Sequence, residues 1–395
     1  MSYESATGST SSSEALIRPV MPELDTLRGV AVLWVVLLHG FYWQYSTLSV
    51  GALARKILVL TQPGWVGVNL FFVLSGFLIT GILLDSKNRP SFYRRFYTRR
   101  ALRILPPYYA LLALLLLLHS ASTPFVGLSF IYLANMTNFF GVACDYGPLW
   151  SLAVEEHFYI VWPMIVRATT RRRLAFLSMA IVIVVPALRV ASFNRGGSTG
   201  WYTWLVVDGL ATGSVLAVYL RGGCQRKSVR RLCRTLLISA VLMGVLGYPF
   251  GITTRERVLG AALQYTTVNV FFAGILLLFL LFGSSSRKGF VKSPILRFFG
   301  YISYGLYLDH LLVFRMYDRI GHRYVPALMP ADGHFDLVLL RFALAVGVAI
   351  GVAYLSRRYF EGYFLGLKDH IVPGVPSQAN ALRPDQNSSS GVEAA

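Results

Sequence analysis

Residues 21–43, MPELDTLRGVAVLWVVLLHGFYW, form an apolar segment long enough to cross a bilayer, and they include Arg28 and His39. A charge or a polar ring inside a bilayer is costly unless it has a partner or a function. The two residues are eleven positions apart, which makes three helical turns plus about 20°, so their side chains share one helix face about 16 Å apart. The pair predicts a ligand-binding cation at the membrane edge and an imidazole near mid-depth.

The composition is that of a polytopic membrane protein. Of the 395 residues, 55% are hydrophobic and 14% are charged, and the mean hydropathy is +0.56. Apolar stretches of membrane length recur along the chain. We predict an all-α bundle of about ten transmembrane helices, at residues 26–46, 64–85, 101–119, 149–168, 174–191, 200–220, 233–250, 262–282, 297–317 and 336–356. The shorter stretch 124–141 contains Asn135 and Asn138, so we expect a re-entrant or interfacial segment there.

The net charge of +19 follows membrane topology. If the N-terminus is placed in the cytoplasm, the loops predicted inside are rich in Arg and Lys, and the loops predicted outside carry only scattered cations. This alternation is the positive-inside pattern. We therefore expect both termini in the cytoplasm, a lipid bilayer as the surrounding partner and no nucleic acid. The three cysteines show no metal-ligand spacing, so we expect no metal.

The chain is expected to hold one folded domain. Residues 1–20 and 371–395 are polar and Ser-rich and are predicted to be disordered tails, which leaves residues 21–370 as the transmembrane domain. The sequence contains no Walker loop, no dinucleotide-binding glycine motif and no Gly-x-Ser-x-Gly elbow. Nucleotide hydrolysis and redox cofactors therefore have no support.

Small residues follow one another along the apolar stretch 64–80. Gly64, Gly67, Ser75 and Gly76 have the spacing that lets membrane helices approach closely. We expect this segment to pack tightly against other helices.

An acidic cluster lies inside an otherwise apolar span. The segment 149–163, LWSLAVEEHFYIVWP, contains Glu155, Glu156 and His157. A carboxylate there must find a partner, line a cavity or become protonated, unless it lies near the outer interface and is simply hydrated. Glu155 shares a helix face with Ser151 and Tyr159, whereas Glu156 points about 100° away, so we expect the two acids not to serve one site.

Polar residues on three predicted helices lie at similar depths. Counting the helical rise from the membrane edges places Glu155 and His39 within about 6 Å of each other in depth. Asp309 and His310, in GYISYGLYLDHLLVF, come out at a similar level. We therefore expect the three clusters to meet in the outer half of the bundle.

Arginines gather at the predicted cytoplasmic end of another helix. RRFYTRRALRILPPYY places Arg99, Arg100 and Arg103 before a helix that Pro106–Pro107 is expected to interrupt. Such a row binds anionic lipid headgroups or simply satisfies the positive-inside rule in many proteins. The alternative is a phosphate clamp, formed together with Arg28 at the same face, to which the forked guanidinium is well suited.

Six of these segments together resemble the integral-membrane acyltransferase-3 family. They are LDTLRGVAVLWVVLLH, GVNLFFVLSGFLIT, RRALRILPPYY, LWSLAVEEHFYIVWP, ISYGLYLDH and RRYFEGYF, in the family's order across residues 22–366. The resemblance implies transfer of acyl groups, commonly acetyl, from cytoplasmic acyl-CoA to hydroxyls of carbohydrates or other acceptors. The family's acceptors include O-antigen, exopolysaccharide, peptidoglycan and some macrolides. We expect a stand-alone membrane domain without the esterase-like domain that some members carry.

The resemblance also implies roles for individual residues. Arg28 and His39 match the family's Arg-x10-His signature, whose histidine is implicated in catalysis. Glu155 matches the first acid of the Trp-Ser-Leu-x-x-Glu motif. Arg100 and Arg103 match the basic pair before the proline.

The C-terminal motif departs from the family pattern. Glu361 matches the acid of a Phe-Glu-x-Pro motif, but Tyr363 stands where the family has proline, and Thr26 replaces a frequent glycine. We expect the substrate-binding side chains to be Ser75, Glu156, Tyr304, Asp309, His310 and Glu361.

These features fit one expected mechanism in a bacterial plasma or inner membrane. Acyl-CoA, usually acetyl-CoA, enters from the cytoplasm with its phosphates on Arg28, Arg99, Arg100 and Arg103. The distance from Arg28 to His39 is comparable to the reach of a pantetheine arm. His39 then acts as a general base on the acceptor hydroxyl or carries the acyl group itself, and Glu155 orients the imidazole.

Two other functions are compatible with some of these features. A proton-coupled transporter or flippase could use His39 and Glu155 as a proton relay, but its inverted halves should leave matching broken helices, which the sequence lacks. A lipid-binding structural protein would explain the arginines but not the acids inside the span.

Overall fold

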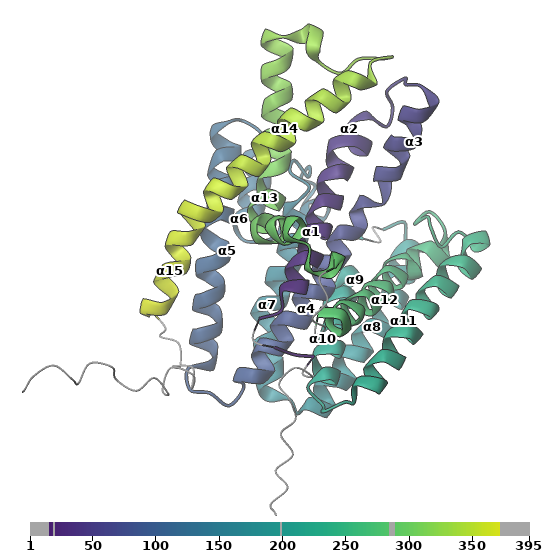
Figure 1. Cartoon of the computed structure of the whole chain (residues 1–395), viewed down its shortest axis with the longest axis vertical. Coiled ribbons are helices and arrows are strands. Elements are labelled where there is room, and N and C mark those ends of the chain that lie inside the picture. The colour runs from purple at the N-terminus through teal and green to yellow at the C-terminus, as the bar shows by residue number, and fades with distance from the viewer. Residues whose placement is uncertain (1–15, 19, 198–199, 284–288, 372–395) are drawn as a thin grey trace, which may run out of the picture.

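The structure is a computed structural model that describes residues 16–18, 20–197, 200–283 and 289–371. The predicted tails at 1–20 and 371–395 lie mostly outside the described residues. Within the described residues the helices are α1 (Pro22–Leu37), α2 (Trp43–Tyr45), α3 (Ala52–Thr61), α4 (Val66–Ser86), α5 (Phe92–Leu117), α6 (Thr123–Phe130), α7 (Leu149–Ala168), α8 (Arg171–Phe193), α9 (Thr203–Val206), α10 (Asp208–Leu220), α11 (Arg226–Gly247), α12 (Val258–Gly283), α13 (Pro294–Tyr324), α14 (Phe335–Leu355) and α15 (Glu361–Ile371) (Figure 1). One-turn π-helical segments, Leu38–Tyr42 and Ser356–Phe360, connect α1 to α2 and α14 to α15.

Seven helical segments of the described chain are long and apolar enough to cross a membrane. They are Pro22–Tyr45, Ala52–Ser86, Phe92–Leu117, Arg171–Phe193, Arg226–Phe250, Val258–Gly283 and Phe335–Leu367. The all-α class and the multi-pass membrane character are therefore confirmed. α7 and α13, of 20 and 31 residues, match two further predicted spans but carry carboxylates and histidines, and the predicted span 200–220 contains α10 of 13 residues. The count of ten crossings stays a prediction.

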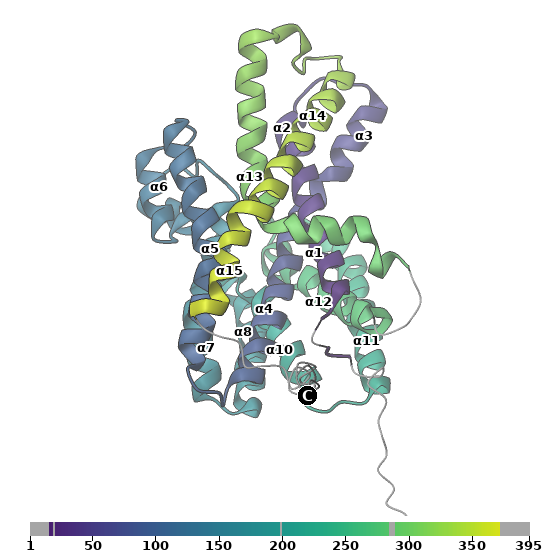
Figure 2. The ribbon, with the colours of Figure 1, turned by 60° about the vertical axis from the view of Figure 1, so that its left-hand side comes forward.

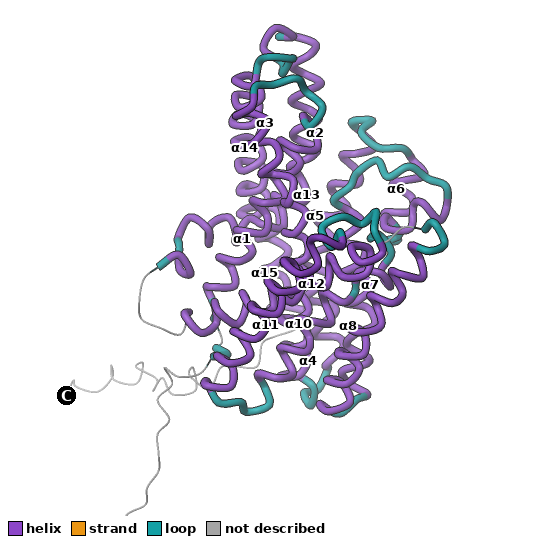
Figure 3. Tube along the Cα trace, turned by 90° about the vertical axis from the view of Figure 1, so that its right-hand side faces the viewer, coloured by secondary structure: helices purple, strands orange, loops and turns teal. Residues whose placement is uncertain are grey.

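The predicted interfacial stretch 124–141 does not form a membrane-length helix. α6 has eight residues, about 12 Å at the α-helical rise, and a short 3-10 segment, Ala134–Phe140, follows it. Both fall well short of a hydrocarbon core of about 30 Å. In Figures 2 and 3, α2, α3 and parts of α13 and α14 project together at the top, and α6 lies to one side.

α1 lies in the middle of the bundle and packs against α13, α4 and α12 (Figure 1). Glycines allow the closest of these approaches. A Cβ atom added to Gly29 of α1 would lie 2.0 Å from the carbonyl oxygen of Leu296, and one added to Gly300 of α13 would lie 2.0 Å from that of Asp25. The backbones of α1 and α13 are therefore in direct contact, and this contact holds Arg28 beside α13.

The small residues of α4 and of the turn before it pack as predicted. A Cβ atom at Gly76 would lie 1.9 Å from the carbonyl oxygen of Leu210 in α10. Cβ atoms at Gly64 and Gly67 would lie 2.2 and 2.4 Å from backbone oxygens of α1. The prediction of close helix packing is confirmed for these three glycines. Ser75 instead donates a hydrogen bond to a carboxylate, described below.

The interruption predicted at Pro106–Pro107 is wrong, because α5 continues from Phe92 to Leu117 through both prolines. A proline inside a helix removes one backbone hydrogen bond and adds a steric clash. Packing of α5 in a bundle can offset such a loss, because neighbouring helices and side chains satisfy the freed backbone groups. The arginines before the prolines therefore belong to the same rigid helix as the apolar part of α5.

A buried polar network joins α8, α10 and α12. Arg189 is fully buried and forms an ion pair with Asp208. Its guanidinium also donates to the carbonyl oxygens of Leu205 and Ala262, at 2.7 Å each. Removing one partner of such a pair is costly because it leaves the other charge buried without compensation.

Gly76→Ala is expected to destabilise the fold by about 1–3 kcal/mol, the usual cost of overpacking, because the new methyl group would meet the α10 backbone. The measurement is the thermal unfolding midpoint of the purified protein in detergent. Gly351→Ala in α14 is the matched control, because a Cβ atom there meets nothing within 4 Å. Equal midpoints for the two variants would contradict the close contact between α4 and α10.

Candidate functional site

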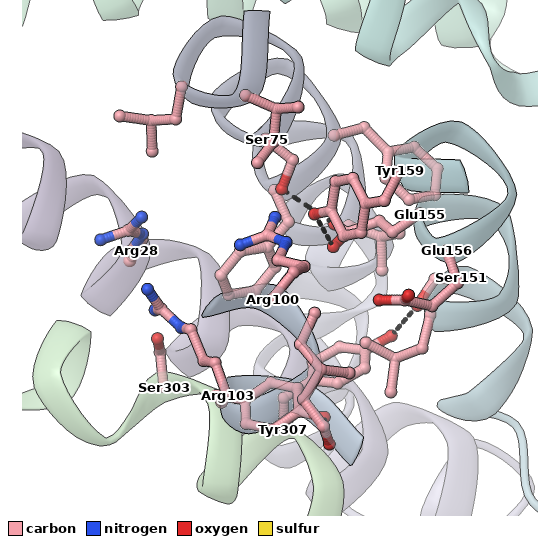
Figure 4. Close-up of a pocket in the computed structure, with 18 of the residues that line it drawn as sticks. Arg28, Ser75, Arg100, Arg103, Ser151, Glu155, Glu156, Tyr159, Ser303 and Tyr307 are labelled. Atoms are coloured by element: carbon pink, nitrogen blue, oxygen red, sulfur yellow. Dashed lines mark hydrogen bonds between the residues drawn. The ribbon is translucent and has the colours of Figure 1, made fainter. Parts of the chain in front are cut away.

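Three arginines and two carboxylates line one cavity between α1, α4, α5, α7 and α13. The space between these helices, including the part open to solvent, is about 950 Å³. We call it the arginine cavity; its polar lining includes Arg28, Ser75, Arg100, Arg103, Ser151, Glu155, Glu156, Tyr159, Ser303, Tyr304 and Tyr307. In Figure 4, Arg28 and Arg103 lie on one side, Glu155 and Glu156 on the other, and Arg100 between them.

The arginines of this cavity have few partners in the protein. Arg28 pairs with Asp25 three residues earlier, at 2.8 Å. Arg100 lies over the Tyr159 ring, with Cζ 3.9 Å from the ring centroid. Neither Arg100 nor Arg103 forms an ion pair with any described residue. Two of the three cations therefore lack an ion-pair partner among the described residues, which favours an anionic ligand.

Arg99 differs from the other predicted phosphate ligands. It is exposed, as Arg103 is, but it does not line the arginine cavity. It lies one turn nearer the start of α5 than Arg103, about 6 Å along the helix axis.

Glu155 and Glu156 line the same cavity, so the expectation that the two acids serve separate sites is wrong. Glu155 accepts hydrogen bonds from the hydroxyls of Ser75 at 3.1 Å and Tyr159 at 2.6 Å. Glu156 accepts none from the described residues. Positions about 100° apart on a helix can both face a cavity that wraps around part of that helix.

His39 lies in the π-helical turn after α1 and is 8% exposed. Its Nδ1 is 2.9 Å from the carbonyl oxygen of Val35 and 3.1 Å from Nε2 of His310. Nδ1 of His310 is in turn 2.9 Å from the carbonyl oxygen of Leu306. The convergence predicted for His39 and His310 is therefore confirmed, and π turns are frequent at functional sites.

These contacts assign the tautomers of both histidines. A carbonyl oxygen only accepts, so Nδ1 of His310 carries a proton and its Nε2 has a free lone pair. Nδ1 of His39 likewise carries its one proton, which is shared between the carbonyl oxygen of Val35 and Nε2 of His310 as acceptors. The lone pair of His39 is consequently on Nε2, the atom a general base would use.

Glu155 does not reach His39, contrary to the predicted meeting of three clusters, since its hydrogen bonds go to Ser75 and Tyr159. Asp309 is half-buried and lines none of the cavities described here. Glu361 is buried and pairs with Arg357 of the preceding π turn at 3.3 Å, also outside these cavities. Tyr304 lines the arginine cavity and donates to the carbonyl oxygen of Ile104 at 3.0 Å.

Two further cavities meet at His39. The aromatic cavity, about 640 Å³, is lined by His39, by Trp43, Trp65, Trp150 and Trp201, and by Asn69, Arg255, Tyr265 and Tyr307 among others. The charged cavity, about 730 Å³, is lined by His39, Trp43, Trp201, Gln44, Cys144, Arg315, Asp318 and Arg341 among others. The sequence gives no functional signal at these tryptophans, because tryptophan near membrane boundaries is common in any membrane protein.

Cys144 lines the charged cavity together with His39, so its thiol is a candidate nucleophile besides the His39 imidazole. Burial raises the pKa of this thiol, and the neighbouring Asp145 carboxylate raises it further. The thiolate is the reactive form of cysteine, so this environment disfavours covalent chemistry at Cys144.

A thin partition separates the arginine cavity from the aromatic cavity. Val68 and Tyr307 line both. Tyr307 is 6% exposed, and its hydroxyl is 2.5 Å from the hydroxyl of Ser151. A ligand in the arginine cavity is thus separated from the space beside His39 by the side chains of these residues.

Comparisons with known proteins identify a family and several relatives. Residues 21–358 match a family described as an acyltransferase domain. The chain is 31% identical over 166 residues to a peptidoglycan O-acetyltransferase of Listeria monocytogenes, covering 37% of this chain and 24% of that protein. It is 32% identical over 203 residues to a putative peptidoglycan O-acetyltransferase of Bacillus subtilis, covering 45% and 29%. A putative O-acetyltransferase of Staphylococcus aureus is 26% identical over 376 residues, covering 87% and 57%.

The chain thus spans between 24% and 57% of the length of these three relatives. No solved structure matches it.

Proposed function

The chain belongs to the acyltransferase-3 family, and on this basis we propose that it moves an acyl group, most simply acetyl, from acyl-CoA to a hydroxyl of a carbohydrate. One observation carries the proposal. A cavity lined by three arginines lies back to back with a cavity that contains His39, and Val68 and Tyr307 are the described residues that line both. The O-acetyltransferase and peptidoglycan names of the relatives support an ester-forming reaction on a glycan.

The arginine cavity is the proposed donor site. Arg28, Arg100 and Arg103 would hold the phosphates of CoA, for which forked guanidinium donors are well suited. Arg28 is eleven residues before His39 on the same helical segment, so about 16 Å separates them along the axis. A pantetheine arm that extends from the phosphates toward Tyr307 would bring the thioester close to the partition.

His39 is the proposed general base. Its Nε2 takes the proton of the acceptor hydroxyl as the oxygen attacks the thioester carbonyl carbon, and a C–O bond forms. The tetrahedral intermediate collapses with cleavage of the C–S bond, and the CoA thiolate leaves. The imidazolium then returns the proton to that sulfur, so an ester and free CoA are the products.

His310 is the proposed positioning residue for His39. As a neutral acceptor it holds the Nδ1 proton of His39 and stabilises the imidazolium that forms during transfer. Glu155 receives a different role from the one expected. It fixes Tyr159, on whose ring Arg100 lies, and so positions the donor site.

On the predicted orientation, the arginine cavity faces the cytoplasm and the aromatic and charged cavities face outward. The donor and the acceptor would then approach from opposite sides, with Tyr307 between them. A tyrosine ring tied to Ser151 at this point would keep water away from the thioester until the acceptor is bound.

The proposal is tested with the purified protein in liposomes, acetyl-CoA labelled in the acetyl group and chitotriose, maltotriose or mannotriose as acceptor. We expect label in a base-labile ester of at least one sugar and one free CoA thiol per ester. Sugar movement across the membrane without CoA release would instead support a transporter. Thiol release with label only in free acetate would contradict transfer to a hydroxyl.

A further inference from the structure

The four tryptophans of the aromatic cavity come from separate parts of the chain. Trp43 follows the π turn of α1, Trp65 precedes α4, Trp150 is in the first turn of α7 and Trp201 precedes α9. Two pairs of rings are in contact: Trp150 with Trp201, with centroids 5.5 Å apart, and Trp65 with Tyr265, at 5.4 Å. The protein has seven tryptophans, so more than half of them line this one cavity.

The aromatic cavity also carries polar groups that keep unused hydrogen-bonding atoms. Asn69 is 6% exposed and donates through Nδ2 to Asn269 at 2.8 Å. Its Oδ1 receives no hydrogen bond from any described residue and is free to accept one. Arg255 lies at the exposed edge and donates to the Tyr265 hydroxyl at 2.6 Å. Several guanidinium donors of Arg255 therefore remain for a ligand.

Charge and polarity narrow the ligand class. Aromatic cavities bind quaternary ammonium groups through the faces of the rings, but such a site would not include an arginine. Among the described residues, no carboxylate lines this cavity, and Arg255 does. A lipid tail is disfavoured because it has no polar group to donate to Asn69 Oδ1 and would leave that atom buried without a partner.

A pyranose ring satisfies both requirements. Its C–H groups form flat apolar faces that suit the faces of indole rings, and its rim of hydroxyls can donate to Asn69 and accept from Arg255. We propose that the aromatic cavity is the acceptor subsite, in which tryptophans stack against one or more pyranose rings and present a hydroxyl to His39. This inference rests on the proposed acyl transfer and adds the place and the residues that recognise the sugar.

Position relative to the base supports the assignment. The rings of His39 and Trp43 have centroids 4.7 Å apart in an edge-to-face contact. A sugar stacked in the cavity would therefore lie beside the imidazole. Both Trp43, which is 56% exposed, and His39, which is 8% exposed, line the aromatic cavity.

The test is a fluorescence titration of the purified full chain in detergent with chitotriose, maltotriose, mannotriose and, separately, choline. We expect saturable quenching of tryptophan emission by at least one trisaccharide. Trp201→Ala should raise its half-saturating concentration about tenfold or more, a factor worth about 1.4 kcal/mol. Trp201→Phe, which keeps a flat ring, should lie between that variant and the unchanged protein.

The matched control is Trp204→Ala, because Trp204 is exposed, stacks on Tyr202 and lines none of the cavities described here. It should bind like the unchanged protein. Saturation by choline alone, no saturation by any trisaccharide, or unchanged binding by Trp201→Ala would each overturn the subsite. If the protein binds a trisaccharide with this dependence on Trp201 but transfers no acetyl group, the sugar subsite is supported and the proposed acyl transfer is contradicted.

Discussion

Replacing His39 with alanine is expected to lower kcat for acetyl transfer by about 100- to 10,000-fold, the usual contribution of a general base. The Michaelis constant for acetyl-CoA should change little, because the proposed phosphate ligands lie in another cavity. The measurement is the initial rate of CoA thiol release in liposomes with a saturating sugar acceptor. His322→Ala is the matched control, since His322 is exposed near the end of α13.

Variants of His310, the hydrogen-bond partner of His39, test the positioning role. His310→Ala removes the hydrogen bond to His39 Nδ1 and is expected to lower kcat by about 10- to 150-fold, from the 1.5–3 kcal/mol of a hydrogen bond to a charged group. His310→Gln can still accept through its amide oxygen and should recover part of that loss. A His39→Ala protein that folds normally and keeps full activity would refute the scheme. An acetylated His39 trapped with acetyl-CoA alone would replace the general base by a covalent step.

Arg103→Gln is expected to raise the Michaelis constant for acetyl-CoA by about 10- to 150-fold, because a charge-assisted contact with phosphate is worth about 1.5–3 kcal/mol. The value of kcat should stay close to that of the unchanged protein. Arg103→Lys keeps the charge but loses the forked donors. Its Michaelis constant should therefore lie between those of the unchanged protein and Arg103→Gln. Arg99→Gln is the matched control on the same helix, since Arg99 is exposed and outside the cavity.

The donor itself provides a second test of the same contact. Acetyl-pantetheine lacks the CoA phosphates and should be a poorer donor for the unchanged protein. If Arg103 binds a phosphate, Arg103→Gln should discriminate much less between the two donors, because the two losses are then not additive. Equal discrimination by both proteins would show that Arg103 binds no phosphate, and an equally large effect of Arg99→Gln would assign the arginines to a general surface potential.

Much of the fold was predictable because a bilayer restricts the chain strongly. A backbone that crosses lipid must satisfy its own hydrogen bonds, so long apolar segments become helices whatever surrounds them. The glycines of α4 were predictable for a related reason, since small residues are what lets membrane helices touch. The continuous α5 was not, because the local penalty of Pro106–Pro107 points to a break and only packing in the bundle offsets it.

The candidate site divides in the same way. The position of a residue along a helix axis follows from the rise per residue, so the sequence alone placed Arg28 at one end of a helix and His39 three turns away. It also placed Arg100 and Arg103 in one cluster. The direction in which a side chain points toward its neighbours depends on how the helices are rotated against one another. Contacts such as Gly29 with Leu296 set that rotation.

For this reason only the tertiary structure decided which polar groups meet. It brings His39 and His310 into hydrogen-bond contact, and it places the Tyr159 hydroxyl against Glu155. It separated Arg99 from the arginine cavity, although the sequence treats it like its neighbours. It also brought four tryptophans from four separate segments around one cavity. Helical periodicity specifies depth and face within a single helix, whereas the contacts between helices come from packing of side chains that are far apart in the sequence.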